Sequence, residues 1–434
     1  MGRAIVVGAG LAGLKTALDL QAEGLEVLVL EARSRVGGRA FSFADPVDGT
    51  MLDNGQHVIL GCCTAFRHLL DEMDLHDAVL LPATLHVPIY KNGTWSTLGS
   101  IPAAGPLHLA AGMLKYRHLP VRGRLTALKA ATRFSRPAEA GARSFFHWLQ
   151  AQGQLPAEIE SLWNLLTVSV FNADARELDA GAAIRGFRFG FQGGPGNAAL
   201  GLFQRPLGDV PEAAAARLAS LGAQVRLGTR VNGLRFERGR IQGVTLASGE
   251  QIPADVVVAA VPPARLAHLL EGLPDAQELQ DALRRFPVNP ILNVYLRFSR
   301  PVMEETAVAA VSGPVQFVFN RGALLGQDAD LIALSLSAAG EWVGRSRDEI
   351  MSRLLPELHG ILPGTRTASL KHVRLVWQHD ATVVLTPATA GLRLPPQTPW
   401  AGLTLAGDWT ATDWPCSMES AVRSGTAAAQ AALA

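Results

Sequence analysis

The chain opens on a short β-branched run that leads directly into a glycine motif, and this order constrains its fold more than any other feature. Residues 4–7, Ala-Ile-Val-Val, are typical of a buried parallel strand. They are followed by Gly8-Ala9-Gly10-Leu11-Ala12-Gly13 and then by a helical pattern that stops near Gly24. A second apolar strand, residues 27–30, ends at Glu31. Together these elements predict a βαβ unit that binds a dinucleotide.

Each part of this unit has a physical role. Gly8 permits the tight turn, Gly10 lets a pyrophosphate approach the backbone, and Gly13 lets the helix pack on the strand. The first helical turn supplies free N–H groups and the positive end of a dipole. Glu31 can accept hydrogen bonds from a ribose. The residues of this unit expected to contact the dinucleotide are Gly8, Gly10, Leu11, Ala12, Gly13 and Glu31.

Two further elements favour FAD over NAD. A glycine pair and an arginine, Gly37-Gly38-Arg39, lie beyond the second strand and can add contacts to the pyrophosphate. Near the other end, residues 403–406 predict a strand that leads into Gly407-Asp408, followed by a helix over residues 417–432. A carboxylate at a strand end can bind ribityl hydroxyls, and a helix N-terminus can stabilise the negative charge of reduced flavin. The additional residues expected to hold FAD are Ala32, Arg33, Gly38, Arg39, Gly407, Asp408, Met418, Glu419 and Ala421.

The middle of the chain predicts a return to the nucleotide-binding domain. Residues 213–221 are helical in composition, residues 236–245 predict a hairpin around Arg238-Gly239, and residues 255–259 predict a buried strand. Val231 is expected to contact adenine. The predicted fold class is α/β with two domains, a Rossmann-like FAD-binding domain and an interleaved substrate domain. Their expected segments are 1–75, 205–270 and 398–434 for the FAD-binding domain, and 76–204 and 271–397 for the substrate domain.

A second nucleotide motif is not expected. The glycines between residues 190 and 201 lack the preceding strand that such a motif needs, and they are interpreted as a loop. We therefore predict no dedicated NAD(P)H domain. The electrons that reduce the flavin are expected to come from an external donor.

Charge is balanced overall but segregated locally. The net charge of +1 excludes a globally basic nucleic-acid binder. Residues 78–138 hold no Asp or Glu, yet they hold eight basic residues: Lys91, Lys115, Arg117, Arg122, Arg124, Lys129, Arg133 and Arg136. On a helix, Arg122, Lys129, Arg133 and Arg136 share one stripe, with Leu125 and Leu128 beside it. A basic helical region near 106–136 predicts contact with an anionic membrane surface, with an ordinary solvated helix face as the alternative. An RNA site is disfavoured because aromatic residues are not interleaved with the basic ones.

Cysteine usage and hydropathy set the expected compartment. The three cysteines, Cys62, Cys63 and Cys416, cannot form a disulfide framework, and the adjacent pair is a poor tetrahedral set for zinc. No stretch reaches 18 uninterrupted apolar residues, and no signal-peptide layout precedes the first strand. We expect a cytoplasmic protein without a bound metal, peripheral on the inner face of the cytoplasmic membrane if the basic region contacts lipid.

The assembled motifs resemble the FAD-dependent amine oxidase and carotenoid desaturase superfamily. Within it, the chain resembles the hydroxysqualene dehydroxylases. The family-level segments are Asp53-Asn54-Gly55-Gln56-His57, and Trp409-Thr410 after Gly407-Asp408, with Met418 to Gly425 in the tail. The resemblance adds Gly55, Gln56 and His57 to the residues expected to hold FAD.

The resemblance implies a reaction, the reduction of hydroxysqualene to squalene in hopanoid or related triterpene biosynthesis. Such chemistry needs a general acid for the leaving hydroxide and a dry apolar tunnel for the long isoprenoid chain. His57 is the first candidate for the proton donor, because its ordinary pKa near 6.5 suits acid chemistry near neutrality. Asp53 is the second, either orienting His57 or acting as the acid itself. Asp53 has an alternative interpretation as a turn residue, and His57 as a structural or flavin-contacting imidazole.

Two other functions stay open at this stage. The same FAD site would serve an oxidase or desaturase that takes hydride from a polyene or an amine. A non-catalytic prenyl-binding protein, of the kind formed by the Rab GDP-dissociation inhibitors, would share the fold without flavin. Gly37-Gly38-Arg39 and Gly407-Asp408 argue against this last possibility.

Overall fold

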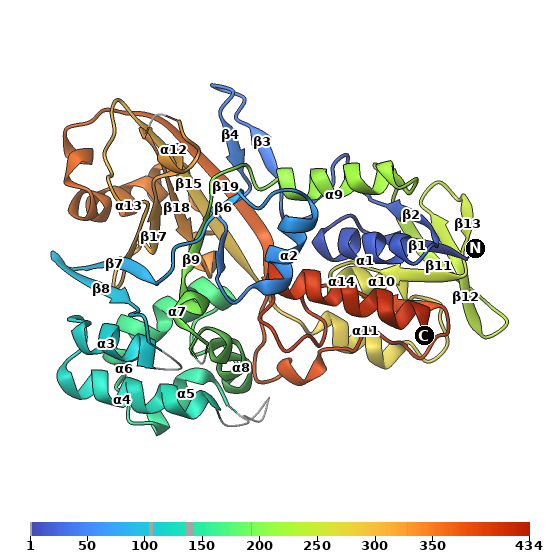
Figure 1. The fold of residues 1–434 in the computed structure, drawn as a ribbon, viewed down its shortest axis with the longest axis horizontal. Coiled ribbons are helices and arrows are strands. Elements are labelled where there is room, and N and C mark those ends of the chain that lie inside the picture. The colour runs from blue at the N-terminus through green and yellow to red at the C-terminus, as the bar shows by residue number, and fades with distance from the viewer. Residues whose placement is uncertain (1, 104–106, 136–142, 192, 328) are drawn as a thin grey trace.

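The computed structural model describes residues 2–103, 107–135, 143–191, 193–327 and 329–434. Two bodies lie side by side along its long axis, and both chain termini lie at the end formed by the first body (Figure 1). The chain passes between the two bodies several times. None of the helices in the described part is long and apolar enough to cross a bilayer.

The first body is built on a parallel sheet of five strands in the order β10-β2-β1-β14-β20. The central strand is the predicted first strand, and it is flanked by strands from widely separated parts of the chain. This confirms the Rossmann-like α/β class predicted from the glycine motif. The strands are β1 (Arg3–Val7), β2 (Glu26–Leu30), β10 (Gln224–Arg226), β14 (Val256–Ala259) and β20 (Leu403–Leu405). These five strands lie within the segments expected to form the FAD-binding domain, whereas residues 277–284, a helix of the same body, lie within the segment expected to form the substrate domain.

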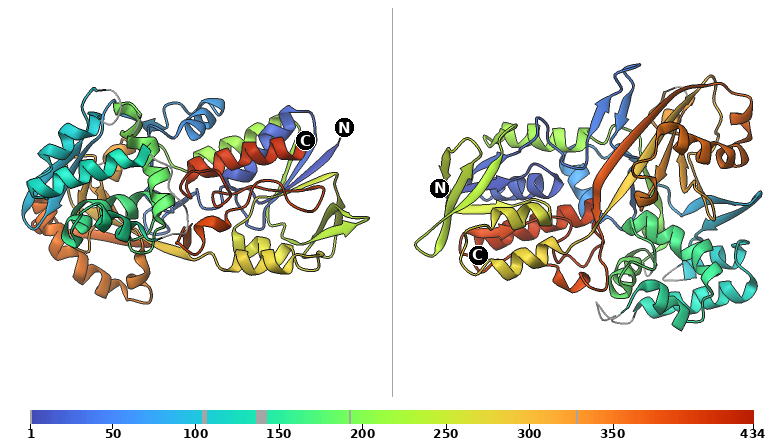
Figure 2. Two further views of the ribbon diagram at one scale, coloured as in Figure 1. Left: turned by 90° about the horizontal axis from the view of Figure 1, so that it is seen from below. Right: turned by 180° about the vertical axis from the view of Figure 1, so that it is seen from behind.

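Alternate residues of β1 face two different cores. Ala4 and Val6 pack with the helices on one face, whereas Ile5 and Val7 pack with a β-layer and two helices on the other. Because both faces are covered, residues 4–7 of this strand are all apolar, as is typical of a buried parallel strand. The first layer consists of α1 (Leu11–Ala22), α9 (Asp209–Ser220) and α14 (Met418–Leu433). The second consists of β11 (Val231–Glu237), β12 (Arg240–Leu246), β13 (Gln251–Pro253), α10 (Pro263–Leu269) and α11 (Gln277–Arg284), as Figure 2 shows.

The hairpin predicted around Arg238 and Gly239 is confirmed. Both residues have positive φ, 53° and 79°, which is the geometry that joins two twisted strands by a two-residue turn. The predicted helix at 213–221 is α9, which begins four residues earlier at Asp209. Asp209 and Glu212 lie in its first turn and favour that earlier start by opposing the helix dipole.

The second body contains a sheet of seven strands in the order β19-β15-β18-β17-β16-β7-β8. Neighbours are antiparallel except β16 and β7, which are parallel. The long strands β15 and β19 extend from this sheet to the first body (Figure 1). The strands are β7 (His86–Lys91), β8 (Thr94–Gly99), β15 (Val288–Phe298), β16 (Ala307–Ala310), β17 (Phe317–Phe319), β18 (Leu331–Leu336) and β19 (Leu370–Val383). The helices α12 (Arg321–Leu324) and α13 (Arg347–Ile361) belong to the same body.

Short elements connect the two bodies. A two-stranded ribbon pairs β3 (Ser42–Ala44) with β4 (Met51–Asp53). A small sheet pairs β9 (Leu200–Phe203) with β5 (Val58–Leu60) and with β6 (Val79–Leu80). The helix α2 (Thr64–Glu72) lies against α14. The segment that carries residues 53–57 therefore lies where the two bodies meet.

A helical layer covers one end of the second body, at the lower left of Figure 1. A buried cluster of aromatic rings, with Trp163, Phe134 and Phe145 at its centre, holds this layer together. Its helices are α3 (Leu107–Lys115), α4 (Val121–Thr132), α5 (Phe145–Ala151), α6 (Pro156–Glu158), a π-helical turn (Ile159–Trp163), α7 (Asn164–Phe171) and α8 (Ala180–Phe191).

The predicted basic helical region is two helices. The chain turns between Lys115 and Val121, where Pro120 caps α4. On α4, Lys129 is exposed, as the predicted stripe requires, but Leu128 is half-buried and packs on the aromatic core. Arg136 lies outside the described residues. The predicted basic stripe is therefore confirmed in part. Of the two leucines predicted beside it, only Leu125 is exposed to solvent.

Candidate functional site

The first glycine motif forms a tight cradle at the end of β1. Gly8 has a φ of 107°, and a Cβ there would lie 2.5 Å from the carbonyl oxygen of Ala260. A Cβ at Gly13 would lie 1.9 Å from the carbonyl oxygen of Gly8. A Cβ at Gly10 would meet nothing within 4 Å. Two glycines therefore serve close packing, and the third leaves open space before the N-terminus of α1, where Leu11 and Ala12 begin the helix.

The glycine pair Gly37-Gly38 lies against the first glycine motif. The amide of Gly37 donates to the carbonyl of Ala9 at 2.8 Å, and Gly37 forms a bridge with Gly10. The virtual Cβ of Gly38 lies 3.3 Å from the Cα of Gly10, so the two glycine segments touch. This contact, between residues about 28 positions apart, supports the sequence interpretation that both segments serve one phosphate site.

Glu31 is fixed at the end of β2. Its carboxylate accepts the amide of Ala9 at 2.8 Å and the amide of Arg33 at 2.8 Å, and the residue is buried. Ala32 and Arg33 are exposed, and the Arg33 guanidinium donates to the carbonyl of Gly38 at 3.0 Å. The acid, the turn after it and the glycine pair thus form one hydrogen-bonded unit.

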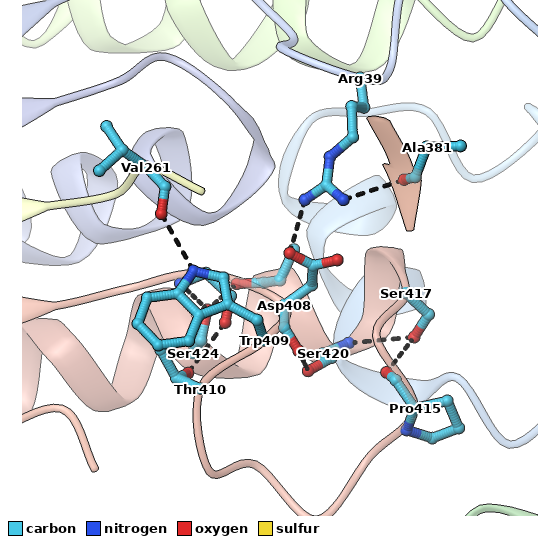
Figure 3. Close-up of polar contacts among 12 residues, drawn as sticks. Arg39, Val261, Ala381, Asp408, Trp409, Thr410, Pro415, Ser417, Ser420 and Ser424 are labelled. Atoms are coloured by element: carbon cyan, nitrogen blue, oxygen red, sulfur yellow. Dashed lines mark hydrogen bonds and ion pairs between the residues drawn. The ribbon is translucent and has the colours of Figure 1, made fainter. Parts of the chain in front are cut away.

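Asp408 is buried in the loop between β20 and α14. Its carboxylate faces Arg39 (Figure 3). Gly407 donates its amide to Ser424 at 2.9 Å, and Ser420 donates its hydroxyl to the carbonyl of Asp408 at 2.7 Å. The carboxylate pairs with Arg39 Nη2 at 2.5 Å. Arg39 was expected to contact the pyrophosphate. In the structure Arg39 holds Asp408 and donates to the carbonyl of Ala381 at 3.0 Å, and its contact with the pyrophosphate stays a prediction.

The N-terminus of α14 supplies free backbone donors. Ser417 caps the helix, and its carbonyl accepts the amide of Ala421 at 2.9 Å. The amide of Ala421 is therefore used within the helix, and the contact of this residue with the cofactor stays a prediction. The amides of Met418 and Glu419 have no partner among the described hydrogen bonds, as expected for a first helical turn.

The side chain of Glu419 binds the first turn of α2. Its two carboxylate oxygens accept the amides of Ala65 and Phe66, at 3.0 and 2.7 Å, in the first turn of α2. It also accepts Arg423 Nε at 2.7 Å. A carboxylate at a helix N-terminus satisfies free N–H groups and opposes the dipole. Glu419 thus caps α2, and only its backbone amide remains for a cofactor.

Gly55 and Gln56 pack against Asn293, a buried residue of β15. The amide of Gln56 donates to Asn293 Oδ1 at 3.1 Å, and a Cβ at Gly55 would lie 2.7 Å from Asn293 Nδ2. In the described part of the chain, Gln56 Oε1 and Asn293 Nδ2 are buried without a hydrogen-bond partner. Buried polar atoms are rarely left unpaired, so a bound polar group is the natural partner for them. This is the observation that best fits FAD to the chain's own residues.

His57 is the half-buried end of this segment. Its Nδ1 lies 2.8 Å from the carbonyl oxygen of Gly55, so Nδ1 carries the proton and donates it to that carbonyl. Nε2 is left as the atom that can gain or lose a proton. Burial lowers the pKa of His57 below its ordinary value. The neutral form is therefore more populated near neutrality than the sequence interpretation assumed.

Asp53 is structural, which corrects the expectation that it acts as the acid. Its Oδ1 accepts the hydroxyl of Ser42 at 2.6 Å and the amide of Leu207 at 2.9 Å, and its Oδ2 pairs with Arg321 Nη2 at 2.5 Å. The hydroxyl of Tyr295 donates to its backbone carbonyl at 2.9 Å. With both oxygens engaged and the residue 1% exposed, Asp53 offers no atom that a substrate could reach.

Sequence reasoning missed three residues that support the site. Asn293, Tyr295 and Arg321 come from the second body and hold the segment that contains Asp53 and His57. No local motif marks them, since they act at sequence separations above 230 residues. The available signal was the place of polar Asn293 between Leu292 and Val294, in the buried part of β15.

Val231, the expected adenine contact, is buried at the start of β11. Its carbonyl accepts Arg265 Nη2 at 2.6 Å. This oxygen already has a partner, and the adenine contact stays a prediction.

The chain matches a family model and several known proteins. The model described as "flavin containing amine oxidoreductase" covers residues 11–433. Hydroxysqualene dehydroxylase of Rhodopseudomonas palustris is 28% identical over 99% of this chain and 98% of that protein. The protein of the same name from Sinorhizobium fredii is 28% identical over 99% and 97%. The 15-cis-phytoene desaturase of Synechococcus elongatus is 25% identical over 100% and 96%.

Solved structures agree on the fold. An oxidoreductase from Methanosarcina mazei has a TM-score of 0.76 at 18% identity, covering 98% of this chain and 99% of that chain. Wild-type putrescine oxidase bound to putrescine has a TM-score of 0.75 at 18% identity, covering 99% and 98%. These similarities show the two-body fold.

Proposed function

The chain belongs to the flavin containing amine oxidoreductase family and is an FAD-dependent oxidoreductase, and we propose that it reduces hydroxysqualene to squalene. The observation that carries the proposal is the 28% identity to two hydroxysqualene dehydroxylases over nearly the whole of each chain. The segment from Gly55 to His57, where the two bodies meet, supplies the chemistry. The proposed pathway is hopanoid or related triterpene biosynthesis.

The reaction replaces an allylic hydroxyl with hydrogen. The C–O bond breaks as the oxygen gains a proton and leaves as water, and the allylic carbon then gains a hydride. Bound FAD, reduced by an external two-electron donor, supplies that hydride. The chain's own residues must hold the cofactor, exclude water and deliver the proton.

Several residues fit the task of holding FAD. The open space before Gly10 and the first turn of α1 receive the pyrophosphate. Glu31 and Asp408, both buried at strand ends, accept hydroxyl donors. The unpartnered Gln56 Oε1 and the free amide of Met418 are polar partners for the flavin ring.

His57 is the proposed proton donor. The Gly55 carbonyl fixes its Nδ1–H, so a proton held at Nε2 is the one that is transferred to the leaving oxygen. Burial lowers the pKa of the imidazole, which makes the imidazolium a stronger acid and a less populated one. We therefore expect the reduction of hydroxysqualene to be fastest at pH values below neutrality.

Product analysis tests the proposal. FAD-loaded protein is incubated with hydroxysqualene and a chemical or enzymatic flavin reductant, and the extract is examined for squalene. The expected result is squalene only when enzyme, FAD and reductant are all present. Absence of squalene, despite demonstrated flavin reduction and substrate binding, would contradict it.

A polyene desaturase is the second candidate. The phytoene desaturases, 25% identical over nearly the full chain, favour it. The reaction would run in the opposite direction, from substrate to oxidised flavin. This second candidate predicts that the protein forms a product from a polyene when an electron acceptor is present. It also predicts that the protein forms no squalene from hydroxysqualene when a reductant is present.

A further inference from the structure

One end of the second body carries an apolar patch in solvent. Four aliphatic side chains of the helical layer are about half exposed or more: Leu114, Val121, Leu125 and Leu155, at 49%, 66%, 55% and 50%. They define the apolar patch. This layer lies at the end of the molecule furthest from the termini, as Figures 1 and 2 show.

Hydrogen bonds join the segments that carry these four residues. Arg124 Nη1 donates to the carbonyl of Leu114 at 2.7 Å, which joins the end of α3 to the first turns of α4. Arg122 Nη2 donates to the carbonyl of Gly153 at 3.3 Å, so the turn before Leu155 lies beside α4. Val121 and Leu125 are four residues apart and share a helix face.

Positive charge surrounds the apolar patch. Lys115, Arg117 and Lys129 are exposed, and none of them has an acidic partner among the described ion pairs. Arg122 is the exception, since it lies 3.7 Å from Glu158, a buried residue of α6. Residues 78–138 contain no Asp or Glu that could neutralise the other basic residues of this segment.

A groove extends the same basic surface toward β8. Its volume is about 1330 Å³, and its wall includes Lys115, Arg117, Arg124 and Arg300, with Trp95 among the apolar residues. Glu304 and Glu305 also line it. Three of the cations of the helical layer therefore face a space that could receive anionic headgroups.

We propose that this face docks on an anionic lipid bilayer. The apolar patch enters the boundary between headgroups and acyl chains, and Lys115, Arg117 and Lys129 contact lipid phosphates. Aliphatic side chains ringed by lysine and arginine suit such a boundary. A protein interface would be enriched in aromatic residues and depleted of lysine. The docking is independent of the reaction proposed above.

Vesicle flotation tests the docking. The FAD-loaded protein is mixed with vesicles of phosphatidylcholine alone or with half phosphatidylglycerol. It should float only with the anionic vesicles, and less at high salt. Val121→Ser with Leu125→Ser should lower the partition coefficient at least about fivefold by removing buried apolar area. Lys115→Glu with Lys129→Glu should lower it at least about tenfold.

Matched controls separate docking from general changes in charge or hydropathy. Arg217→Glu with Arg285→Glu makes the same charge change at exposed residues of the first body, and Leu227→Ser with Val343→Ser removes two exposed aliphatic side chains elsewhere. These variants should float like the parent protein, and all variants should keep the flavin absorbance spectrum. No flotation of the parent with anionic vesicles overturns the proposal. So does flotation that survives both changes in the helical layer.

Discussion

Arg321, in α12 of the second body, forms a buried ion pair with Asp53 at the end of β4. Nη2 and Oδ2 lie 2.5 Å apart, and the two side chains are 0% and 1% exposed. Arg321 also donates to the carbonyl of Phe203 at 3.0 Å. Because Asp53 lies two residues before Gly55, this pair fixes the position of the proposed catalytic segment, Gly55 to His57, against the second sheet.

Removing the cation should destabilise the protein strongly. Arg321→Met leaves the Asp53 carboxylate buried without its charge partner, at a cost of about 3–5 kcal/mol. Urea unfolding of the FAD-loaded protein measures this change. Arg353→Met is the control, since Arg353 pairs with Glu341 at the surface and its loss should cost less than about 1 kcal/mol. Equal losses for the two variants would contradict the buried pair.

The sequence predicted the nucleotide-binding half of the fold well, because its signals are local. A β-branched run, three glycines and an acid lie within one βαβ unit, and their spacing alone specifies the turn. The partner of Asp53 could not be predicted in this way. Arg321 is 268 residues away in a four-residue helix, and no pattern links the two positions.

Two side chains beside the expected cofactor contacts have partners that the sequence did not indicate. Arg39 and Glu419 were assigned to the cofactor from their place beside glycine and helix motifs. In the structure their charged groups are taken by Asp408 and by the N-terminus of α2. A motif fixes the backbone, whereas the direction of a long side chain depends on partners that fold in from elsewhere.

Asp408→Ala should weaken FAD retention. A hydrogen bond to a charged group contributes roughly 1.5–3 kcal/mol, so the Kd for FAD should rise at least about tenfold. Fluorescence titration of the flavin-free protein measures it. Asp380→Ala is the control, because Asp380 is exposed and also near Arg39. Unchanged affinity in Asp408→Ala would contradict the ribityl contact.

His57 should make stability depend on pH. Burial lowers its pKa below the ordinary value of 6.5, so the unfolded chain binds more protons than the folded protein between these two values. The free energy of unfolding should therefore fall as pH drops below about 6.5. His57→Gln should reduce the difference in stability between pH 7.5 and pH 5.5, measured by urea unfolding.

Other histidines limit the size of this effect. Burial also lowers the pKa of His108 and of His118, and both remain in the variant. His76→Gln, a change at an exposed histidine, reports the generic effect of the substitution. A pH difference that is as large in His57→Gln as in the parent protein would argue against the buried, neutral imidazole.

Gly425 sets the distance between α14 and α1, the two helices whose N-termini are proposed to face FAD. A Cβ at this position would lie 2.6 Å from the carbonyl oxygen of Ala12 and 3.0 Å from Lys15 Cβ. Gly425→Ala should push the helices apart and lower the free energy of unfolding by about 1–3 kcal/mol. It should also weaken FAD retention, since both N-termini move.

Gly190 in α8 provides the matched control for this substitution. A Cβ there would meet nothing within 4 Å, so Gly190→Ala should leave stability unchanged or raise it by up to about 1 kcal/mol through helix propensity. Urea unfolding with and without FAD compares the two variants. Because the same chemical change should act with opposite sign at the two positions, a Gly425→Ala protein as stable as Gly190→Ala would disprove the close approach of α14 to α1.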